Sequence, residues 1–129
     1  MGCDIHVLFQ ELKGGVWVPA GEDRPNFYRD YPSFDALAGV RGNSYQLYPQ
    51  RGLPEDLLVE YKEDRDDYTY LGDHSFSWLT LKELRKLSAK VSKKYDEESD
   101  FQTLHDITTD LANIGGAEDK LRVVFGFDS

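Results

Sequence analysis

Apolar and polar residues alternate near both ends of the chain, and this period of two is typical of half-buried strands. Gly14 and Gly15 follow the first alternating segment and predict a turn into VWVP, so residues 3–18 are expected to form a β-hairpin. The segment LRVVFGFD at 121–128 predicts a final strand. In the first segment, Cys3, Ile5, Val7 and Phe9 are expected on one face and Asp4, His6, Leu8 and Gln10 on the other.

Helical spacing of apolar residues follows in the second half of the chain. Thr80 and Glu83 form a capping box ahead of a first stripe, and Ser99 and Gln102 repeat the pattern ahead of a second. Gly115 and Gly116 are expected to end the second helix. The two stripes are Leu84, Leu87, Val91 and Tyr95, then Phe101, Leu104, Ile107, Leu111 and Ile114.

The remaining segments complete an α+β pattern. Ser33 is expected to cap a short helix, FDALAGV, which ends at Gly39 or Gly42. The rest of the region 20–56 is expected to be a long ordered loop, and one more short strand is expected around Thr69 to Leu71. We therefore expect residues 1–129 to form a single α+β domain, an antiparallel sheet of three or four strands covered on one face by two helices.

Composition and charge narrow the possible partners. Hydrophobic residues make up 40% of the 129 residues, enough for a core, and the formal charge is −9, which argues against binding to long nucleic acid. No apolar run approaches the roughly 20 residues of a membrane-spanning helix. The start has no secretory pattern and Cys3 is the single cysteine, so a cytoplasmic protein is expected. A homo-oligomer remains possible because terminal strands can leave an open sheet edge.

The first strand carries one candidate chemical pair. Asp4 and His6 are two residues apart, so both side chains are expected on the face opposite the apolar residues. Such a pair can hold a divalent metal, or it can act as a base with an orienting carboxylate. An ordinary exposed Asp and His on a sheet would give the same pattern.

A second candidate group lies ahead of the first capped helix, in the segment Gly72–Trp78. It combines Asp73, His74, Ser75 and Trp78 and is expected to form a loop that binds an anion, with His74 as acid, base or ligand. Ser77, Thr80 and Trp78 can equally serve only for capping and core packing.

Two chemistries are open if His6 and His74 converge. A pair of imidazoles can act as general base and general acid in phosphodiester cleavage without a metal. Alternatively, Asp4, His6, Asp73 and His74 form a mixed oxygen and nitrogen ligand set that suits Mn, Fe, Zn or Ni and would activate a water.

Three arginines fit either chemistry. Arg29, Arg41 and Arg51 can hold phosphate oxygens, and aromatic residues such as Tyr31 can stack on a base. Each arginine can equally pair with Asp30 or Asp35. The acidic chain with a locally arginine-rich region favours a small phosphorylated ligand.

Several longer motifs carry a family resemblance over most of the chain. The segments MGCDIH, RDYPSFDALAGVR, RGLPED, HSFSWLTLKEL and LRVVFGFD resemble a family of short bacteriophage and prophage proteins without a well-established activity. The resemblance implies a phage origin and a setting in the host cytoplasm. It also selects motif positions for the site, namely Asp4, His6, Arg29, Arg41, Arg51, His74, Ser75 and Trp78.

These observations lead to three functional hypotheses. The first is a phosphodiesterase that cleaves a small, possibly cyclic, nucleotide, with His6, His74, Asp4 and Asp73 as catalytic or metal-ligating residues. The phage setting that the resemblance implies suggests that this nucleotide is a signal of host defence. In this hypothesis Arg29, Arg41, Arg51, Tyr31, Ser75 and Trp78 bind the ligand. The second is a nucleotide-binding protein that sequesters the signal without cleaving it. The third is a protein-binding inhibitor or a structural phage protein.

Overall fold

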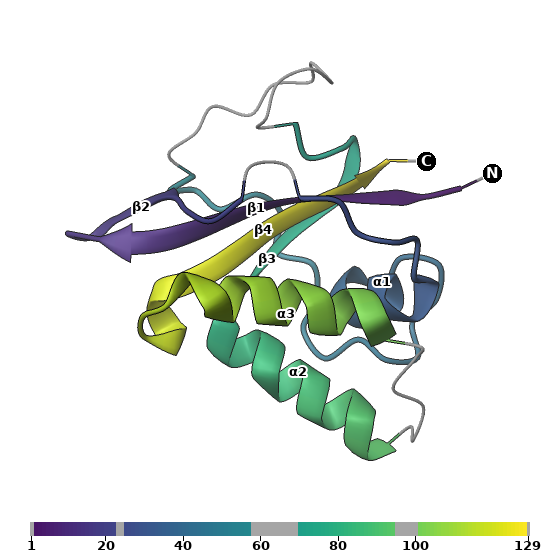
Figure 1. Cartoon of the computed structure of the whole chain (residues 1–129). Coiled ribbons are helices and arrows are strands. Elements are labelled where there is room, and N and C mark those ends of the chain that lie inside the picture. Colours follow the sequence, from purple (N-terminus) through teal and green to yellow (C-terminus); the bar gives the residue numbers. More distant parts are fainter. Residues whose placement is uncertain (1, 23–24, 58–69, 95–100, 129) are drawn as a thin grey trace.

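The computed structural model describes residues 2–22, 25–57, 70–94 and 101–128, and it contains one four-stranded sheet. All neighbouring strands run antiparallel, in the order β2-β1-β4-β3 (Figure 1). The strands are β1 (Asp4–Lys13), β2 (Val16–Pro19), β3 (His74–Thr80) and β4 (Leu121–Asp128). The predicted hairpin and the final strand are thus confirmed.

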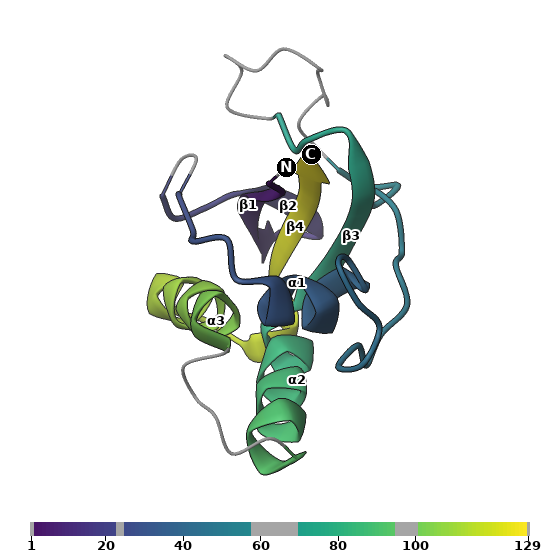
Figure 2. The same ribbon diagram turned by 90° about the vertical axis from the view of Figure 1, so that its right-hand side faces the viewer.

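Three helices cover one face of this sheet (Figures 1 and 2). They are α1 (Tyr31–Ala38), α2 (Leu81–Lys94) and α3 (Gln102–Ile114), and a short 3-10 turn, η2 (Glu118–Lys120), leads into β4. The α+β class is confirmed, and α1 joins the two predicted helices in the covering layer. Across the described ranges, we find no helix with both the length and the apolar character needed to cross a bilayer.

The first and last strands are neighbours in the sheet. Their register runs from Asp4 opposite Asp128 to Glu11 opposite Leu121, and the two chain ends lie side by side in both views (Figures 1 and 2). Residues from opposite ends of the sequence therefore meet at one end of the sheet.

The main core lies between the sheet and the helices. It includes Phe9 of β1, Phe34 of α1, Leu84 of α2, Ile107 of α3 and Phe125 of β4, all with little or no exposure. Cys3 is buried in the same core, as expected for a small apolar residue. The opposite face of the sheet, which we call the second face, has its own smaller cluster of Leu8, Leu71 and Val124, packed by Leu53, Leu57, Phe76 and Trp78.

The segment Gly72–Trp78 differs from the prediction of a loop, because β3 begins at His74. The register between β3 and β4 shifts between His74 and Ser77, which is the mark of a β-bulge. The bulge interrupts the alternation by which a strand is recognised in sequence. The strand predicted around Thr69 to Leu71 falls partly outside the described residues, and Tyr70 and Leu71 belong to no strand.

Helix ends agree with the sequence at the capping box of α2, at Gly39 after α1 and at Gly115, the C-cap of α3, and they differ at the start of α1. The capping box is present, with the Glu83 amide donating to Oγ1 of Thr80 at 3.2 Å and the Thr80 amide donating to Oε1 of Glu83 at 3.0 Å. Gly39, with φ 69°, ends α1. Ser33 is not the cap of α1, since it lies inside the helix and Asp30 occupies the N-cap position. The predicted cap Ser99 falls outside the described residues.

Candidate functional site

A polar contact at the joined ends of the sheet links His6 to Asp128. Nε2 of His6 lies 2.7 Å from Oδ2 of Asp128, and the two side chains are 27% and 14% exposed. The ring of Tyr70 meets the imidazole edge to face, with the centroids 5.0 Å apart. The contact with Asp128 and the ring contact with Tyr70 together fix the orientation of the imidazole.

The partner of Nε2 determines which nitrogen of His6 can act as a base. An ionised carboxylate can only accept a hydrogen bond, so Nε2 carries the proton in the His6–Asp128 pair. In the neutral ring the lone pair is then on Nδ1. This is the arrangement in which a carboxylate orients a histidine for acid–base chemistry.

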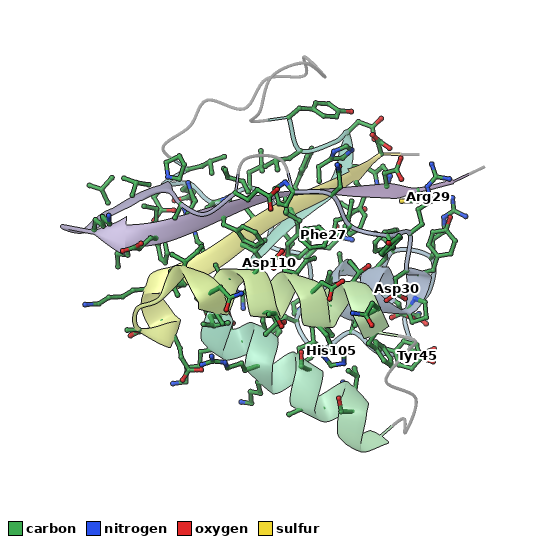
Figure 3. All side chains as sticks on the ribbon, viewed as in Figure 1. Phe27, Arg29, Asp30, Tyr45, His105 and Asp110 are labelled. Atoms are coloured by element: carbon green, nitrogen blue, oxygen red, sulfur yellow. The ribbon has the colours of Figure 1, made fainter. Side chains whose placement is uncertain are left out.

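Asp4 and Arg29 form a side-by-side ion pair next to this imidazole. Nε of Arg29 donates to Oδ1 of Asp4 at 2.7 Å and Nη2 donates to Oδ2 at 3.2 Å. The hydrogen bond from Arg29 lowers the pKa of Asp4, so the carboxylate stays charged. Both side chains are substantially exposed, and Arg29 lies beside the start of β1 (Figure 3).

A polar cavity of about 480 Å³ opens at this place. Asp4, His6 and Tyr70 line one part of it, and Pro25, Asn26 and Phe27 line another. We call Asp4, His6, Arg29, Tyr70 and Asp128 together the His6 site. Its cavity is within the range of small-molecule sites.

Arg41 and Tyr31 lie close to the same end of the sheet. The guanidinium carbon of Arg41 is 5.2 Å from the centroid of the Tyr31 ring. Burial raises the pKa of the Cys3 thiol, Arg41 and Arg29 act to lower it, and Asp128 and Asp4 act to raise it. Arg41 and Arg29 are therefore near enough to Cys3 to act on the thiol, as are Asp128 and Asp4, and the raised pKa favours the protonated thiol.

His74 is on the opposite face of the sheet from His6. The Cα of His74 is opposite Phe127, whose side chain belongs to the main core, whereas His6 is opposite Gly126. Because neighbouring residues of a strand point to opposite faces, the two imidazoles are separated by the sheet. His6 and His74 therefore do not converge as the sequence analysis predicted.

His74 instead makes local contacts. Its Nδ1 lies 2.8 Å from Oγ of Ser75, its Nε2 lies 4.0 Å from Oδ1 of Asp73, and its ring stacks on Phe127 at 6.3 Å between centroids. Ser75 has a left-handed backbone with φ 60° at the bulge. These residues form a second polar group, apart from the His6 site.

The four predicted metal ligands are divided in the same way. Asp4 and His6 lie in the His6 site, and Asp73 and His74 lie in the group on β3. Within the described ranges, no three His, Cys, Asp or Glu side chains are placed so that they could hold one metal ion.

Arg51 and Trp78 lie together, but in a different cavity from His6. Nη1 of Arg51 donates to Oε1 of Glu83 at 2.8 Å and to the Trp78 carbonyl at 3.2 Å, while Nη2 donates to the other oxygen of Glu83. The guanidinium also stacks over the Trp78 ring at 4.6 Å. The guanidinium of Arg51, which was expected to hold phosphate, is therefore bound by Glu83 and Trp78.

Asp128 and Tyr70 are residues of the site that sequence reasoning missed. Asp128 is at a polar position of the alternating last strand. A prediction that the first and last strands pair would have placed it beside Asp4 and His6. Nothing comparable marks Tyr70, which reaches His6 from outside any strand.

Comparison with known proteins adds nothing to this geometry, because no family model, curated protein or solved structure matches the chain.

Proposed function

We propose that this protein binds a small phosphorylated, nucleotide-like ligand at the His6 site and cleaves it as a phosphodiesterase, with His6 as the general base. The observation that carries the proposal is the 2.7 Å contact between His6 and Asp128 beside the polar cavity. In this role Nδ1 of His6 takes the proton of the attacking hydroxyl or water. Since His74 is on the other face, the leaving oxygen takes its proton from solvent.

Charge near the site supports a phosphorylated ligand. Arg29 and Arg41 balance Asp4 and Asp128 in formal charge, so the acidity of the whole chain is offset at this place. Guanidinium groups bind phosphate oxygens and stabilise the charge that grows during cleavage. Arg29 is held by Asp4 on two of its nitrogens, so a ligand would share it with that carboxylate.

A second candidate function is sequestration of the same ligand without cleavage. The observation in its favour is that the site contains one imidazole, because β3 carries His74 on the far side of the sheet. Cleavage would then depend on solvent to protonate the leaving oxygen. A binding protein needs only the cavity, the arginines and the aromatic residues.

The resemblance to phage proteins suggests which ligands to try first. In a host cytoplasm, cyclic nucleotides that signal infection are small, phosphorylated and within reach of such a protein. The third hypothesis, a protein-binding inhibitor or structural protein, has no feature of the described residues in its favour beyond the fold itself.

Incubation with a panel of cyclic and linear nucleotides, followed by chromatography, tests the proposal. New products that disappear in His6→Ala and persist in His105→Ala support the phosphodiesterase, since His105 lies on α3 outside the site. Intact ligand recovered after denaturation of the protein supports sequestration. If no ligand of the panel is either cleaved or retained, both functions are contradicted.

A further inference from the structure

The two tryptophans of the chain line one cavity of about 500 Å³. Trp17 comes from β2 and Trp78 from β3, on opposite edges of the sheet. Arg122 of β4 and the loop residues Asp56 and Glu55 also line it. No residue of this cavity lines the cavity at His6, so the two are separate places on the protein.

Arg122 is the most deeply buried charge of this cavity. It is 2% exposed, and its guanidinium carbon lies 4.2 Å from the centroid of Trp17 and 5.5 Å from that of Trp78. Nε donates to Oε1 of Gln10 at 2.8 Å, and Nη1 donates to Oδ1 of Asp56 at 3.0 Å. Two of its three nitrogens are therefore bonded.

The third nitrogen of Arg122 is not satisfied. Nη2 is buried without a hydrogen-bond partner in the structure as described, and so is Nε2 of Gln10, the residue opposite Arg122 in the sheet. A buried donor without an acceptor destabilises the fold, and more so when it is charged. Both orphaned groups are donors, so the missing partner is an acceptor, and an anionic oxygen satisfies a guanidinium best.

Asp56 is an unusual partner for so buried a cation. Its side chain is 64% exposed, against 2% for Arg122. Burial lowers the pKa of Arg122, and the hydrogen bond to Asp56 counteracts this. The exposed carboxylate of Asp56 is easily returned to water, and an incoming anion that takes its place keeps the buried guanidinium compensated.

We propose that the tryptophan cavity is a second ligand site, which takes a small organic anion whose carboxylate or phosphate oxygen binds Arg122 in exchange for Asp56. The apolar or aromatic body of the ligand packs against the indoles that line the cavity. In the protein without ligand, Asp56 holds the place of that anion on Nη1, and the ligand adds an acceptor for Nη2. This proposal does not depend on the His6 site.

Tryptophan fluorescence reports on this cavity alone, since both indoles line it. We would titrate the full chain with two matched pairs of probes, excited where the probes do not absorb. Adenosine monophosphate and adenosine differ by a phosphate, and benzoate and benzamide differ by a carboxylate. The proposal expects the charged member of at least one pair to bind, and which pair responds identifies the headgroup. Equal response to charged and neutral members would overturn the exchange at Arg122.

Two loop variants then test the exchange itself. Asp56→Asn removes the competing carboxylate from Arg122, and it should lower the dissociation constant of the charged probe about fivefold, the equivalent of one exposed ion pair. Glu55→Gln removes one negative charge from the neighbouring residue of the cavity. This variant should change the dissociation constant of the charged probe by less than about twofold. Equal effects of the two variants would mean that net charge alone matters, and they would contradict the proposal.

Both positions are exposed, and the amide oxygen that Asp56→Asn introduces can still accept the hydrogen bond from Nη1 of Arg122, so both variants should keep the fold. If none of the four probes changes the fluorescence of either the wild-type protein or Asp56→Asn, the cavity is not an anion site and Nη2 is satisfied by water. That outcome would overturn the proposal and would leave the function proposed for His6 untouched.

Discussion

His6 and Asp128 are 122 positions apart in the chain, yet Nε2 of one lies 2.7 Å from Oδ2 of the other. The contact exists because β1 and β4 are neighbours and pair along almost their whole length. The last strand therefore completes a polar site that the first strand begins. Asp128 is a positioning residue, since its carboxylate acts on the imidazole and through it on the ligand.

Asp128→Asn should reduce cleavage while leaving binding largely intact. An amide keeps the size of the side chain but loses the charge that fixes the proton on Nε2, so the lone pair of Nδ1 is no longer assured. We expect turnover to fall about 100-fold, the lower range for loss of a general base. The measurement is the rate of cleavage over pH 5–9, in which the profile of the variant should differ from that of the wild type in shape as well as in height.

Asp119→Asn is the matched control for this charge change, because Asp119 is exposed in η2 and belongs to neither cavity. It should keep the wild-type rate and pH profile. An unchanged profile in Asp128→Asn would show that the carboxylate does not orient His6.

His74→Ala should leave cleavage and binding at the His6 site within about twofold of wild type, whereas His6→Ala should lose activity about 100-fold or more. The reason is that the sheet separates the two imidazoles. Rates and dissociation constants of both variants on the same ligand decide the matter. A loss in His74→Ala as large as that in His6→Ala would mean that the two rings act together.

Alternation along the first strand was enough to predict that Asp4 and His6 share a face, and to predict the core residues between them. It could not predict the partners of that face, because strand order is decided by packing of the whole sheet. The position of His74 was beyond reach for a different reason. The bulge before Ser77 breaks the period of two, so the segment resembled a loop and its faces could not be assigned.

The arginines show the same limit. Their number and clustering suggested a phosphate clamp, but a guanidinium binds whichever carboxylate the fold brings near. Arg29 meets Asp4, 25 positions away, and Arg51 meets Glu83, 32 positions away. For these two arginines the sequence had offered Asp30 and Asp35 as partners, and the fold supplies Asp4 and Glu83 instead. Asp35 instead accepts the backbone amides of Ser44 and Tyr45, both at 3.0 Å, and so orders the loop after α1.

Gly126→Ala should destabilise the protein by about 2 kcal/mol or more. A methyl group at this position of β4 would overlap the carbonyl oxygen of Leu71 and lie 2.6 Å from Cδ1 of Phe76. The backbone at Leu71 cannot move away cheaply, since Leu71 is buried in the cluster on the second face. Urea denaturation measures the change in the free energy of unfolding.

Gly14→Ala provides the comparison, because Gly14 sits in the hairpin turn with φ 58° and nothing within 4 Å of an added methyl. Its cost is conformational, about 1 kcal/mol. A smaller loss in Gly126→Ala than in Gly14→Ala would mean that Leu71 does not lie against β4 as the structure has it.

Glu83→Gln should lower the free energy of unfolding at neutral pH by about 1–3 kcal/mol, because it removes the charge that satisfies half-buried Arg51. Burial acts to raise the pKa of Glu83, but the hydrogen bonds from Arg51 and Thr80 outweigh it and hold the pKa below the ordinary 4.5. A carboxyl group with a lowered folded pKa stabilises the fold above its unfolded pKa, and this stability is lost as the pH falls through the folded value. Urea denaturation of both proteins at pH 7 and pH 3 should therefore show a difference in the free energy of unfolding that is smaller at pH 3 than at pH 7.

Glu118→Gln is the control, since Glu118 makes an exposed pair with Arg85 at 2.6 Å. This variant should change the free energy of unfolding by less than about 1 kcal/mol at either pH. If the difference in the free energy of unfolding between wild type and Glu83→Gln is the same at both pH values, the lowered pKa of Glu83 is contradicted.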